Sequence, residues 1–139
     1  MLILGWFGVG KSTLMRNNKS VADLTDMGQP SLSLLKDTIE KYDIVLADPQ
    51  WTNVFLESGI PFHIVVPTLD RKEEFMKNYH DRWKKGLGGG SDKFCGFMEM
   101  VWDTWISYLL SLPALSHIEL EEGEWLSDAV SHLSACQSD

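Results

Sequence analysis

Four residues near the start of the chain have types and a spacing that suit phosphate chemistry. Gly5, Gly10, Lys11 and Ser12 fit the pattern G-x-x-x-x-G-K-S inside the stretch "LILGWFGVGKSTLM". In such a loop the glycines let backbone amides approach phosphate oxygens, the lysine neutralises phosphate charge, and the serine hydroxyl binds Mg²⁺. The pattern therefore predicts a binding loop for nucleotide phosphates, with a purely structural glycine turn as the alternative.

The residues around this pattern support the prediction. An apolar strand precedes the loop and a helix follows it, so the N–H groups of Gly8 to Ser12 would point at phosphate oxygens. Lys11 would bridge the β- and γ-phosphates. Thr13 lies one position further along, and we assign it to the α-phosphate side of the nucleotide or to helix packing.

A carboxylate that would hold the metal follows a second apolar strand. In "DIVLAD", four apolar residues lead to Asp48 at the carboxyl end of the expected strand, where the ligands of α/β sheets gather. The alternative is that Asp48 starts the turn before Pro49 and caps the next helix. The sequence favours the metal role, which Asp48 would share with Ser12.

Two further acidic residues follow the second expected strand. Asp23 and Asp26, in "ADLTD", could orient a phosphate acceptor or the metal. Short acidic residues are also common in turns. The sequence leaves both interpretations open.

A set of basic residues could neutralise a phosphoryl group during its transfer. The set consists of Arg71, Arg82, Lys84 and Lys85. The alternative is a solvated helix face with ion pairs between neighbouring turns. We favour the functional role for Arg82 and the helix face for Arg71, which has acidic neighbours.

Apolar runs of strand length alternate with stretches of helical period, which predicts βαβ units and a parallel sheet. The expected strands are Met1–Leu4, around Ser20–Leu24, Asp43–Ala47, Phe62–Val66 and Ser116–Leu120. The expected helices are Lys11–Asn17, Ser31–Lys41, Thr52–Ser58, Asp70–Lys85 and one that begins at Phe94. In this last helix we expect one face to belong to the core, formed by Phe94, Phe97, Met98, Val101, Trp102, Trp105, Ile106 and Leu109.

Composition limits the possible classes of protein. A chain of 139 residues with 44% hydrophobic residues fits one domain, residues 1–139. The net charge of -8 argues against a nucleic acid duplex or a membrane surface as partner, although all twelve basic residues lie between Lys11 and Lys93. Cys95 and Cys136 lack metal-ligand spacing, and no apolar run is long enough for a signal peptide or a membrane span, so we expect a cytoplasmic protein. A homodimer is possible.

The stretch "GLGGGSD", Gly86 to Asp92, is expected to be a short glycine-rich lid at about residues 85–93. It does not follow a strand, which argues against a dinucleotide fingerprint.

The order of these segments resembles the small P-loop nucleotide kinases of bacteriophages and their bacterial relatives, over nearly the whole chain. The segments that carry the resemblance are "GWFGVGKST", "DLTD", "YDIVLAD", "GIPFHIVVPTLDRKEEFMKNYHDR", "WDTWISYL" and "HIEL...GEWLSDAV". The resemblance implies a three-layer P-loop NTPase fold with a five-stranded parallel sheet in the order 2-3-1-4-5 and helices on both faces. It also implies residues that bind ATP and Mg²⁺, an acidic turn toward the acceptor and arginines that clamp phosphates. These residues are Lys11 and Ser12, Asp23 or Asp26, and Arg82 with Arg71.

From the motifs and the resemblance we expect an ATP-dependent kinase that acts on a nucleoside or deoxynucleoside monophosphate, in the host cytoplasm if the chain is phage-encoded. The catalytic residues would be Lys11, Arg82 and Asp23. Such a reaction needs no general base, because an acceptor phosphate is already ionised at neutral pH. Two alternatives remain open: a kinase for another small hydroxylic acceptor or a polynucleotide end, and a nucleotide-binding or regulatory module with little turnover.

Overall fold

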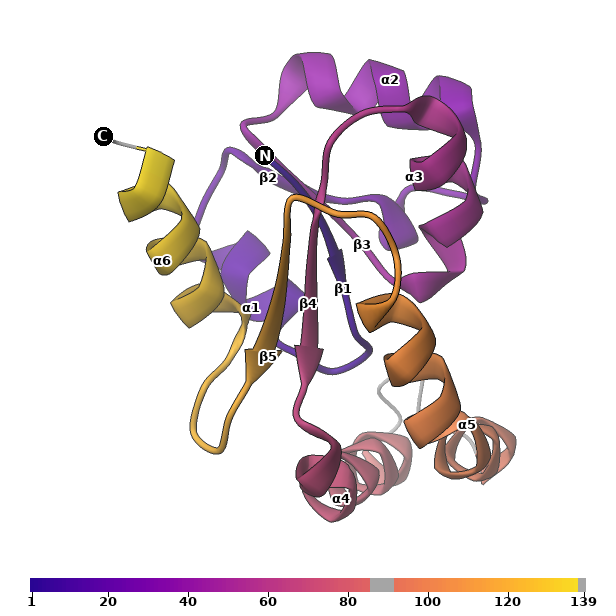
Figure 1. The fold of residues 1–139 in the computed structure, drawn as a ribbon. Helices are drawn as coiled ribbons and strands as arrows, with labels where there is room; N and C mark the ends of the chain where they lie inside the picture. The colour runs from indigo at the N-terminus through magenta and orange to yellow at the C-terminus, as the bar shows by residue number, and fades with distance from the viewer. Residues whose placement is uncertain (86–91, 138–139) are drawn as a thin grey trace.

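The computed structural model describes residues 1–85 and 92–137, apart from the side chains of Trp83, Cys136 and Gln137. Its centre is a sheet of five parallel strands in the order β2-β3-β1-β4-β5 (Figure 1). The strands are β1 (Leu2–Gly5), β2 (Val21–Asp23), β3 (Ile44–Ala47), β4 (His63–Pro67) and β5 (Ser116–Leu120). The predicted strands and parallel sheet are confirmed, and so is the strand order that the resemblance implies.

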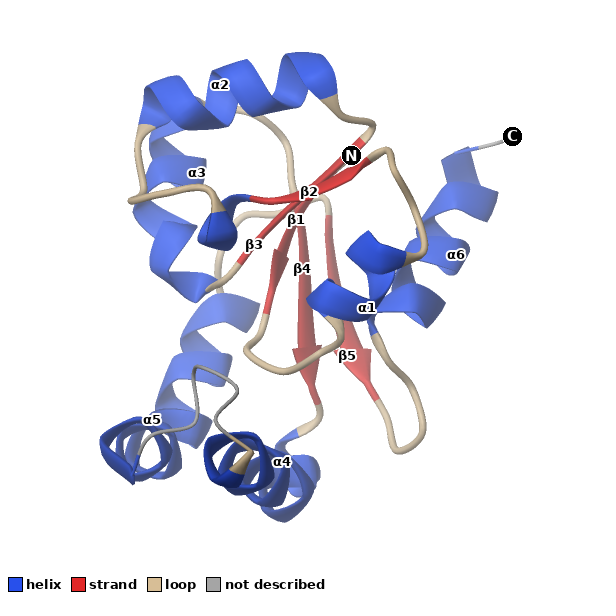
Figure 2. Cartoon of the chain, turned by 180° about the vertical axis from the view of Figure 1, so that it is seen from behind, coloured by secondary structure: helices blue, strands red, loops and turns tan. Residues whose placement is uncertain are grey.

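Helices connect the strands and lie on both sides of the sheet (Figures 1 and 2). They are α1 (Lys11–Arg16), α2 (Leu32–Lys41), α3 (Thr52–Ser58), α4 (Lys72–Lys84), α5 (Asp92–Leu110) and α6 (Leu126–Gln137). Short 3-10 turns at Leu24–Asp26, Pro49–Trp51 and Leu69–Arg71 follow β2, β3 and β4. Helices α1 and α6 lie together on one side, and α2 and α3 lie on the other (Figure 1).

Two helix ends follow directly from local sequence. The Ser31 hydroxyl accepts a hydrogen bond of 3.1 Å from the Leu34 amide and so caps the start of α2. Gly59, at the end of α3, has a φ of 70°, a left-handed conformation that costs glycine little. These signals place the two ends within one residue of the predicted positions.

The hydrophobic core lies on both faces of the sheet, between the strands and the helices. Every residue of β1, β3 and β4 is buried, as expected for strands that helices cover on two sides. The largest fully buried side chains include Trp6, Trp51 and Trp102. Trp6 packs edge-to-face against Trp102 of α5, with ring centroids 5.7 Å apart, and thereby joins the loop after β1 to that helix.

The predicted core face of α5 is only partly correct. Met98, Trp102, Ile106 and Leu109 are buried, but Phe97 is 47% exposed. The eight expected positions spread over about 180° of the helix circumference, and the protein covers only part of that arc. The neighbouring Cys95, which lay outside the expected set, is buried instead.

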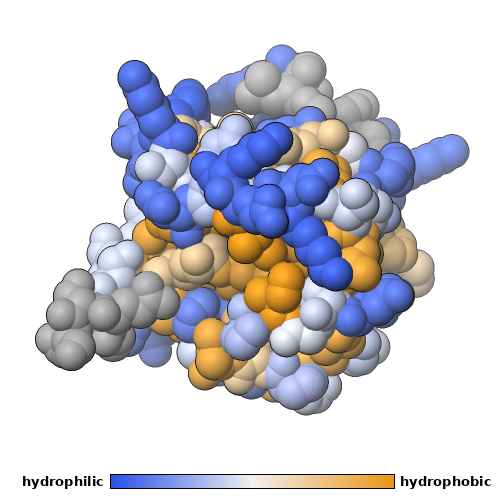
Figure 3. Space-filling model, turned by 90° about the horizontal axis from the view of Figure 1, so that it is seen from above, coloured by the Kyte–Doolittle hydropathy of each residue, from blue (hydrophilic) through white to orange (hydrophobic). Residues whose placement is uncertain are grey.

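An apolar hollow lies at the amino ends of β4 and β5, away from the loop that follows β1. Its walls come from the end of α3, the segment before β4 and the segment before β5, and include Leu56, Pro61 and Leu115. Figure 3, which looks onto the molecule from above, shows exposed apolar atoms surrounded by hydrophilic side chains. None of the described helices is both long and apolar enough to cross a membrane.

Candidate functional site

Three neighbouring strands bring the predicted site residues to one edge of the sheet. β1 lies next to β3, with Leu4 opposite Ala47, so the loop that begins at Gly5 and the segment that begins at Asp48 leave the sheet side by side. β2 flanks β3 on its other side and ends at Asp23. Because all strands are parallel, these ends lie at the same, carboxyl edge, where α/β proteins bind their ligands.

The loop after β1 is held by three other elements. Its anchoring hydrogen bonds join the Trp6 amide to the Val65 carbonyl of β4 (2.9 Å), the Tyr79 hydroxyl of α4 to the Phe7 carbonyl (2.7 Å), and the Leu126 amide of α6 to the Val9 carbonyl (2.9 Å). These partners are far apart in the sequence. The conformation of the loop therefore depends on the whole fold and not on its own residues alone.

In this loop most carbonyl groups have hydrogen-bond partners within the protein, whereas most amide groups have none among the described residues. The loop carbonyls that accept hydrogen bonds are those of Gly5, Trp6, Phe7, Val9 and Gly10. Within residues 1–85 and 92–137, the following amides of the loop and the first helical turn donate to no acceptor: Gly8, Gly10, Lys11, Ser12 and Thr13. A run of unpaired N–H groups after a strand and into a helix is the arrangement that binds phosphate.

Two glycines make this loop conformation possible. Gly8 has a φ of 83° and Gly10 a φ of 106°, values that residues with a Cβ atom rarely adopt. A Cβ atom on Gly8 would also lie 3.1 Å from Cε1 of Tyr79. The loop therefore needs glycine at position 8 for both its conformation and the space beside α4.

The Lys11 side chain folds back over its own loop. Its ammonium nitrogen donates to the carbonyl oxygens of Gly5 and Trp6, each at 2.9 Å. Burial lowers the pKa of Lys11 below its ordinary value, although the nearby carboxylates of Asp23 and Asp48 act in the opposite direction. The cation thus lies at the loop, where it could reach a phosphate group, with acidic groups close by.

The two carboxylates are both buried, and each also stabilises a turn. Asp23 is 6% exposed and accepts a hydrogen bond of 3.0 Å from the Thr25 amide. Burial raises the pKa of Asp23, while the charge of Lys11 opposes that rise. Asp48 is 3% exposed, and one of its oxygens accepts from the Gln50 amide at 2.8 Å.

The capping role that the sequence offers for Asp48 is therefore present in the structure. It does not use the whole carboxylate, because the capping hydrogen bond of Asp48 involves Oδ1. The Thr25 hydroxyl, which accepts a hydrogen bond of 3.2 Å from the Asp48 amide, joins the turns after β2 and β3. The second carboxylate oxygen of Asp48 and the exposed hydroxyl of Ser12 fit the hard oxygen ligands that Mg²⁺ takes from a protein.

Arg82 lies in the last turn of α4 and is exposed. Its charge is close enough to Lys11 to contribute to the lowered pKa of that lysine. The structure thus brings Arg82 near the loop. Lys84 and Lys85 are exposed beyond it. Of the lid predicted at about residues 85–93, residues 86–91 lie outside the described residues, and Asp92 and Lys93 belong to α5.

Arg71 has a different environment from the one expected. It is 4% exposed, and its guanidinium group makes a two-pronged ion pair with Glu74, with N–O distances of 2.9 and 2.8 Å. One guanidinium nitrogen also donates to the carbonyl of Leu120, the last residue of β5, and to those of Glu121 and Glu124 in the turn before α6. Its charged carbon lies 5.1 Å from the ring centroid of Phe75 and 4.9 Å from that of Trp125. Arg71 is therefore a buried structural residue and not part of a solvated helix face.

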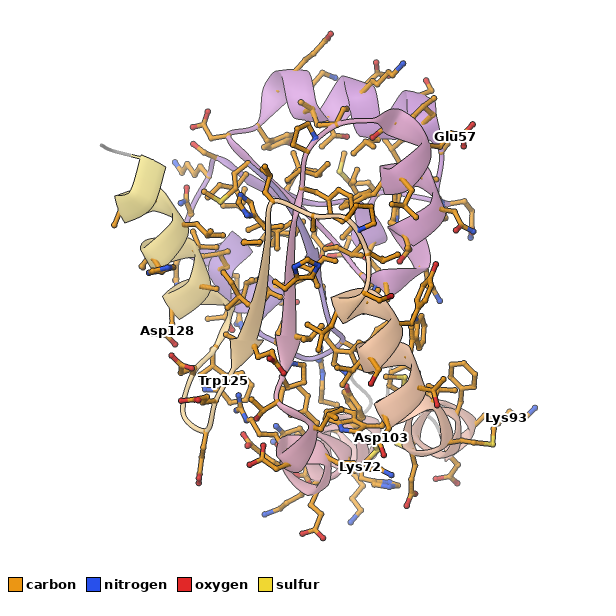
Figure 4. The ribbon with its side chains drawn as sticks, in the orientation of Figure 1. Glu57, Lys72, Lys93, Asp103, Trp125 and Asp128 are labelled. Atoms are coloured by element: carbon orange, nitrogen blue, oxygen red, sulfur yellow. The ribbon has the colours of Figure 1, made fainter. Side chains whose placement is uncertain are left out.

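The hydrogen bonds of Arg71 connect the start of α4 to the turn before α6, and Figure 4 labels a neighbouring residue in each of these segments. Trp125 lies at the turn into α6, and Lys72, the residue after Arg71, lies at the start of α4 below it. Leu126, next to Trp125, is fully buried and bonds the loop through its amide. Leu126 thus belongs to the core, and the partly buried Trp125 packs against it.

Sequence reasoning missed the residue on α4 that contacts the loop most closely. Tyr79 is 2% exposed, and its hydroxyl bonds the Phe7 carbonyl. The available signal was the pair Phe75 and Tyr79, four residues apart on a helix that is otherwise strongly polar. That spacing predicts a buried stripe on one side of α4, but it does not predict that the stripe packs against the loop after β1.

Asp26 is exposed, at the end of the turn after β2, and its charge contributes weakly to the electrostatic environment of Lys11. Among the described residues, no group of three or more His, Cys, Asp or Glu side chains could hold a metal ion by itself. A Mg²⁺ ion that is bound together with a nucleotide takes one or two protein ligands and completes its shell with phosphate oxygens and water. The pair Ser12 and Asp48 therefore remains a chemically suitable set.

The fold and the edge of the sheet define an α/β protein with a loop suited to an anion after its first strand. Comparisons with protein-family models, curated proteins and solved structures gave no match.

Proposed function

We propose that this protein transfers the γ-phosphoryl group of ATP to a nucleoside or deoxynucleoside monophosphate. The observation that carries the proposal is the set of amides without an acceptor among the described residues, those of Gly8, Gly10, Lys11, Ser12 and Thr13. They lie beside a lysine whose ammonium group lies over the same loop. Such a loop can bind several phosphate oxygens at once, and the G-x-x-x-x-G-K-S spacing adds specificity for a nucleotide.

Each residue has a role that its position supports. Lys11 would move from its own loop carbonyls to the β- and γ-phosphates, where the charge is more negative. Ser12 and Asp48 would hold Mg²⁺, which would neutralise charge on the phosphates when it is bound. Asp23 would orient the acceptor, and Arg82 would stabilise charge on the transferring group.

The proposed reaction requires the protein to position the two substrates and does not require a side chain to transfer a proton. An oxygen of the acceptor phosphate attacks the γ-phosphorus in line with the bond to the leaving ADP, and that bond breaks as the new one forms. The acceptor oxygen is already ionised, so no side chain has to remove a proton. The buried carboxylates of Asp23 and Asp48 are consistent with roles in orientation and metal binding.

A coupled assay of ADP release tests this proposal. ATP, Mg²⁺ and each of a panel of ribo- and deoxynucleoside monophosphates are mixed with the wild-type protein, with Lys11→Ala as the blank. One monophosphate should stimulate ADP release far above the blank. If none does, the kinase proposal is wrong.

One observation favours a second candidate, a nucleotide-binding module with little turnover. Arg71, one of the two arginines that the resemblance places at the phosphates, is instead bound to Glu74 and to backbone carbonyls. In the described part of the chain this leaves Arg82 as the arginine that influences Lys11 electrostatically. Binding of ATP to the wild type and not to Lys11→Ala, without stimulated ADP release, would support this candidate.

A further inference from the structure

Tyr79 connects helix α4 to the centre of the candidate phosphate loop. Its hydroxyl donates a hydrogen bond of 2.7 Å to the Phe7 carbonyl, across 72 positions of sequence. Its ring edge lies against Gly8, because a Cβ atom placed there would be 3.1 Å from Cε1 of Tyr79. The same side chain therefore contacts both residues of one peptide unit.

The geometry of that peptide unit gives the contact its meaning. The Phe7 carbonyl and the Gly8 amide belong to a trans peptide bond, in which the C=O and N–H groups point in opposite directions. The hydroxyl that holds the Phe7 oxygen therefore also directs the Gly8 N–H to the other side of the peptide plane. That N–H is one of the amides with no acceptor among the described residues.

Residue 8 itself leaves the orientation of this peptide undetermined. Glycine adopts positive and negative φ with similar ease, so the Phe7–Gly8 peptide could rotate to place its carbonyl, and not its amide, toward a phosphate. A carbonyl oxygen in that position would repel the anion. An external hydrogen bond is therefore needed to select the orientation in which the amide can donate.

Tyr79 is well suited to supply that hydrogen bond. Its ring packs edge-to-face against Phe94, with centroids 5.2 Å apart, and against Phe75 at 6.3 Å, so the side chain is held from two sides. It is 2% exposed, and burial raises the pKa of its phenol above the usual value. The hydroxyl consequently keeps its proton and remains a donor throughout the neutral pH range.

We propose that Tyr79 is a positioning residue that fixes the Phe7–Gly8 peptide so that the Gly8 amide donates to a phosphate oxygen of the bound nucleotide. This inference rests on the proposed function for the identity of the ligand. The orientation of the peptide itself is a property of the protein without nucleotide, and it can be measured separately.

The test compares wild-type protein with Tyr79→Phe, which removes the hydroxyl and keeps the ring. Ile39→Val, a small truncation on α2 in the half-buried rim of the core, is the control for general loss of stability. Calorimetric titration with ATP and Mg²⁺ should show about tenfold weaker binding for Tyr79→Phe, the effect of one lost hydrogen bond. Ile39→Val should bind as wild type does.

A second measurement uses the ¹H–¹⁵N NMR signal of Gly8 without nucleotide. In Tyr79→Phe this signal should shift and broaden because the peptide is free to rotate, while Ile39→Val leaves it unchanged. An unchanged Gly8 signal together with unchanged ATP affinity would overturn the inference. If the wild type binds no ATP, the proposed function fails, and the Gly8 signal alone then decides whether Tyr79 orients the peptide.

Discussion

The ammonium nitrogen of Lys11 lies 2.9 Å from the carbonyl oxygen of Gly5, the residue that ends strand β1 and begins the candidate phosphate loop. The lysine of the motif therefore donates a hydrogen bond to the carbonyl of the first glycine of the motif. Asp23 and Asp48 lie close enough to raise the pKa of this lysine against the larger, opposite effect of burial. A lysine side chain placed in this way stays bound to the loop carbonyls until a stronger acceptor is present.

Replacement of Lys11 by methionine should separate ligand binding from stability. We expect ATP affinity, measured by calorimetry with Mg²⁺, to fall by about 10- to 100-fold, because hydrogen bonds to a charged donor contribute roughly 1.5–3 kcal/mol. The free energy of unfolding should change by less than about 1 kcal/mol, because loss of two hydrogen bonds is offset by removal of a buried charge. Lys84→Met, an exposed change at the end of α4, is the control. Equal ATP affinity in Lys11→Met and wild type would contradict the role of this lysine.

Replacement of Arg71 should lower the stability of the protein much more than replacement of Arg82. Arg71→Met leaves Glu74 and three carbonyl groups without their partner, so we expect a loss of about 3 kcal/mol in the free energy of unfolding. Arg82→Met removes an exposed side chain and should change stability by less than about 0.5 kcal/mol. Urea denaturation of both variants measures this difference.

The rate of phosphoryl transfer should depend on Arg82 more than on Arg71. Arg82→Met should lower the rate of phosphoryl transfer if Arg82 stabilises the transferring group, while Arg71→Lys, which keeps the charge, should retain the rate in the folded protein. Equal stability losses in Arg71→Met and Arg82→Met would show that the buried contacts of Arg71 contribute little.

Glycine at position 8 should be more sensitive to substitution than glycine at position 59. Both residues have positive φ, 83° and 70°, so alanine at either position costs about 1–2 kcal/mol in backbone strain. At Gly59 a Cβ atom would meet nothing within 4 Å, but at Gly8 it would lie 3.1 Å from the Tyr79 ring. Gly8→Ala should therefore lower the melting temperature more than Gly59→Ala and should also weaken ATP binding. The proposed close contact between Gly8 and Tyr79 would be refuted by equal melting temperatures.

The general plan of the fold was predictable because it depends on local patterns. The apolar runs around Val45 and Val65 indicate strands covered on two sides, and the glycine at position 59 indicates the end of a helix. The loop motif and Asp48 were also correctly placed at strand ends, since a strand followed by a polar residue is a local signal.

Contacts between distant segments could not be predicted in the same way. The charge pattern around Arg71 is that of an ordinary exposed helix start, and its burial depends on Trp125, which is 54 positions away. Tyr79 likewise acquires its role from packing against the loop after β1. Helical periodicity also overestimated the core face of α5, because it does not reveal how much of that face the protein covers, and Phe97 is exposed.

Asp23 should give the stability of the protein a specific dependence on pH. Burial raises its pKa in the folded state above the ordinary value of 3.8, so between these two values the folded protein binds more protons than the unfolded chain. The contribution of this group to the free energy of unfolding is fully present below pH 3.8 and is lost as the pH rises through the folded pKa. Asp23→Asn keeps an oxygen that can accept from the Thr25 amide but does not titrate.

The measurement for Asp23 is the difference in unfolding free energy between wild type and Asp23→Asn, from urea denaturation at several pH values between 3 and 7. Taken as wild type minus variant, this difference should fall as the pH rises from about 4 and then become constant, because the other titrating groups cancel. A difference that rises with pH would mean that the attraction to Lys11 outweighs burial and lowers the pKa of Asp23. In that case the carboxylate would act as the ionic partner of the loop lysine, and removing it should also change the affinity for ATP.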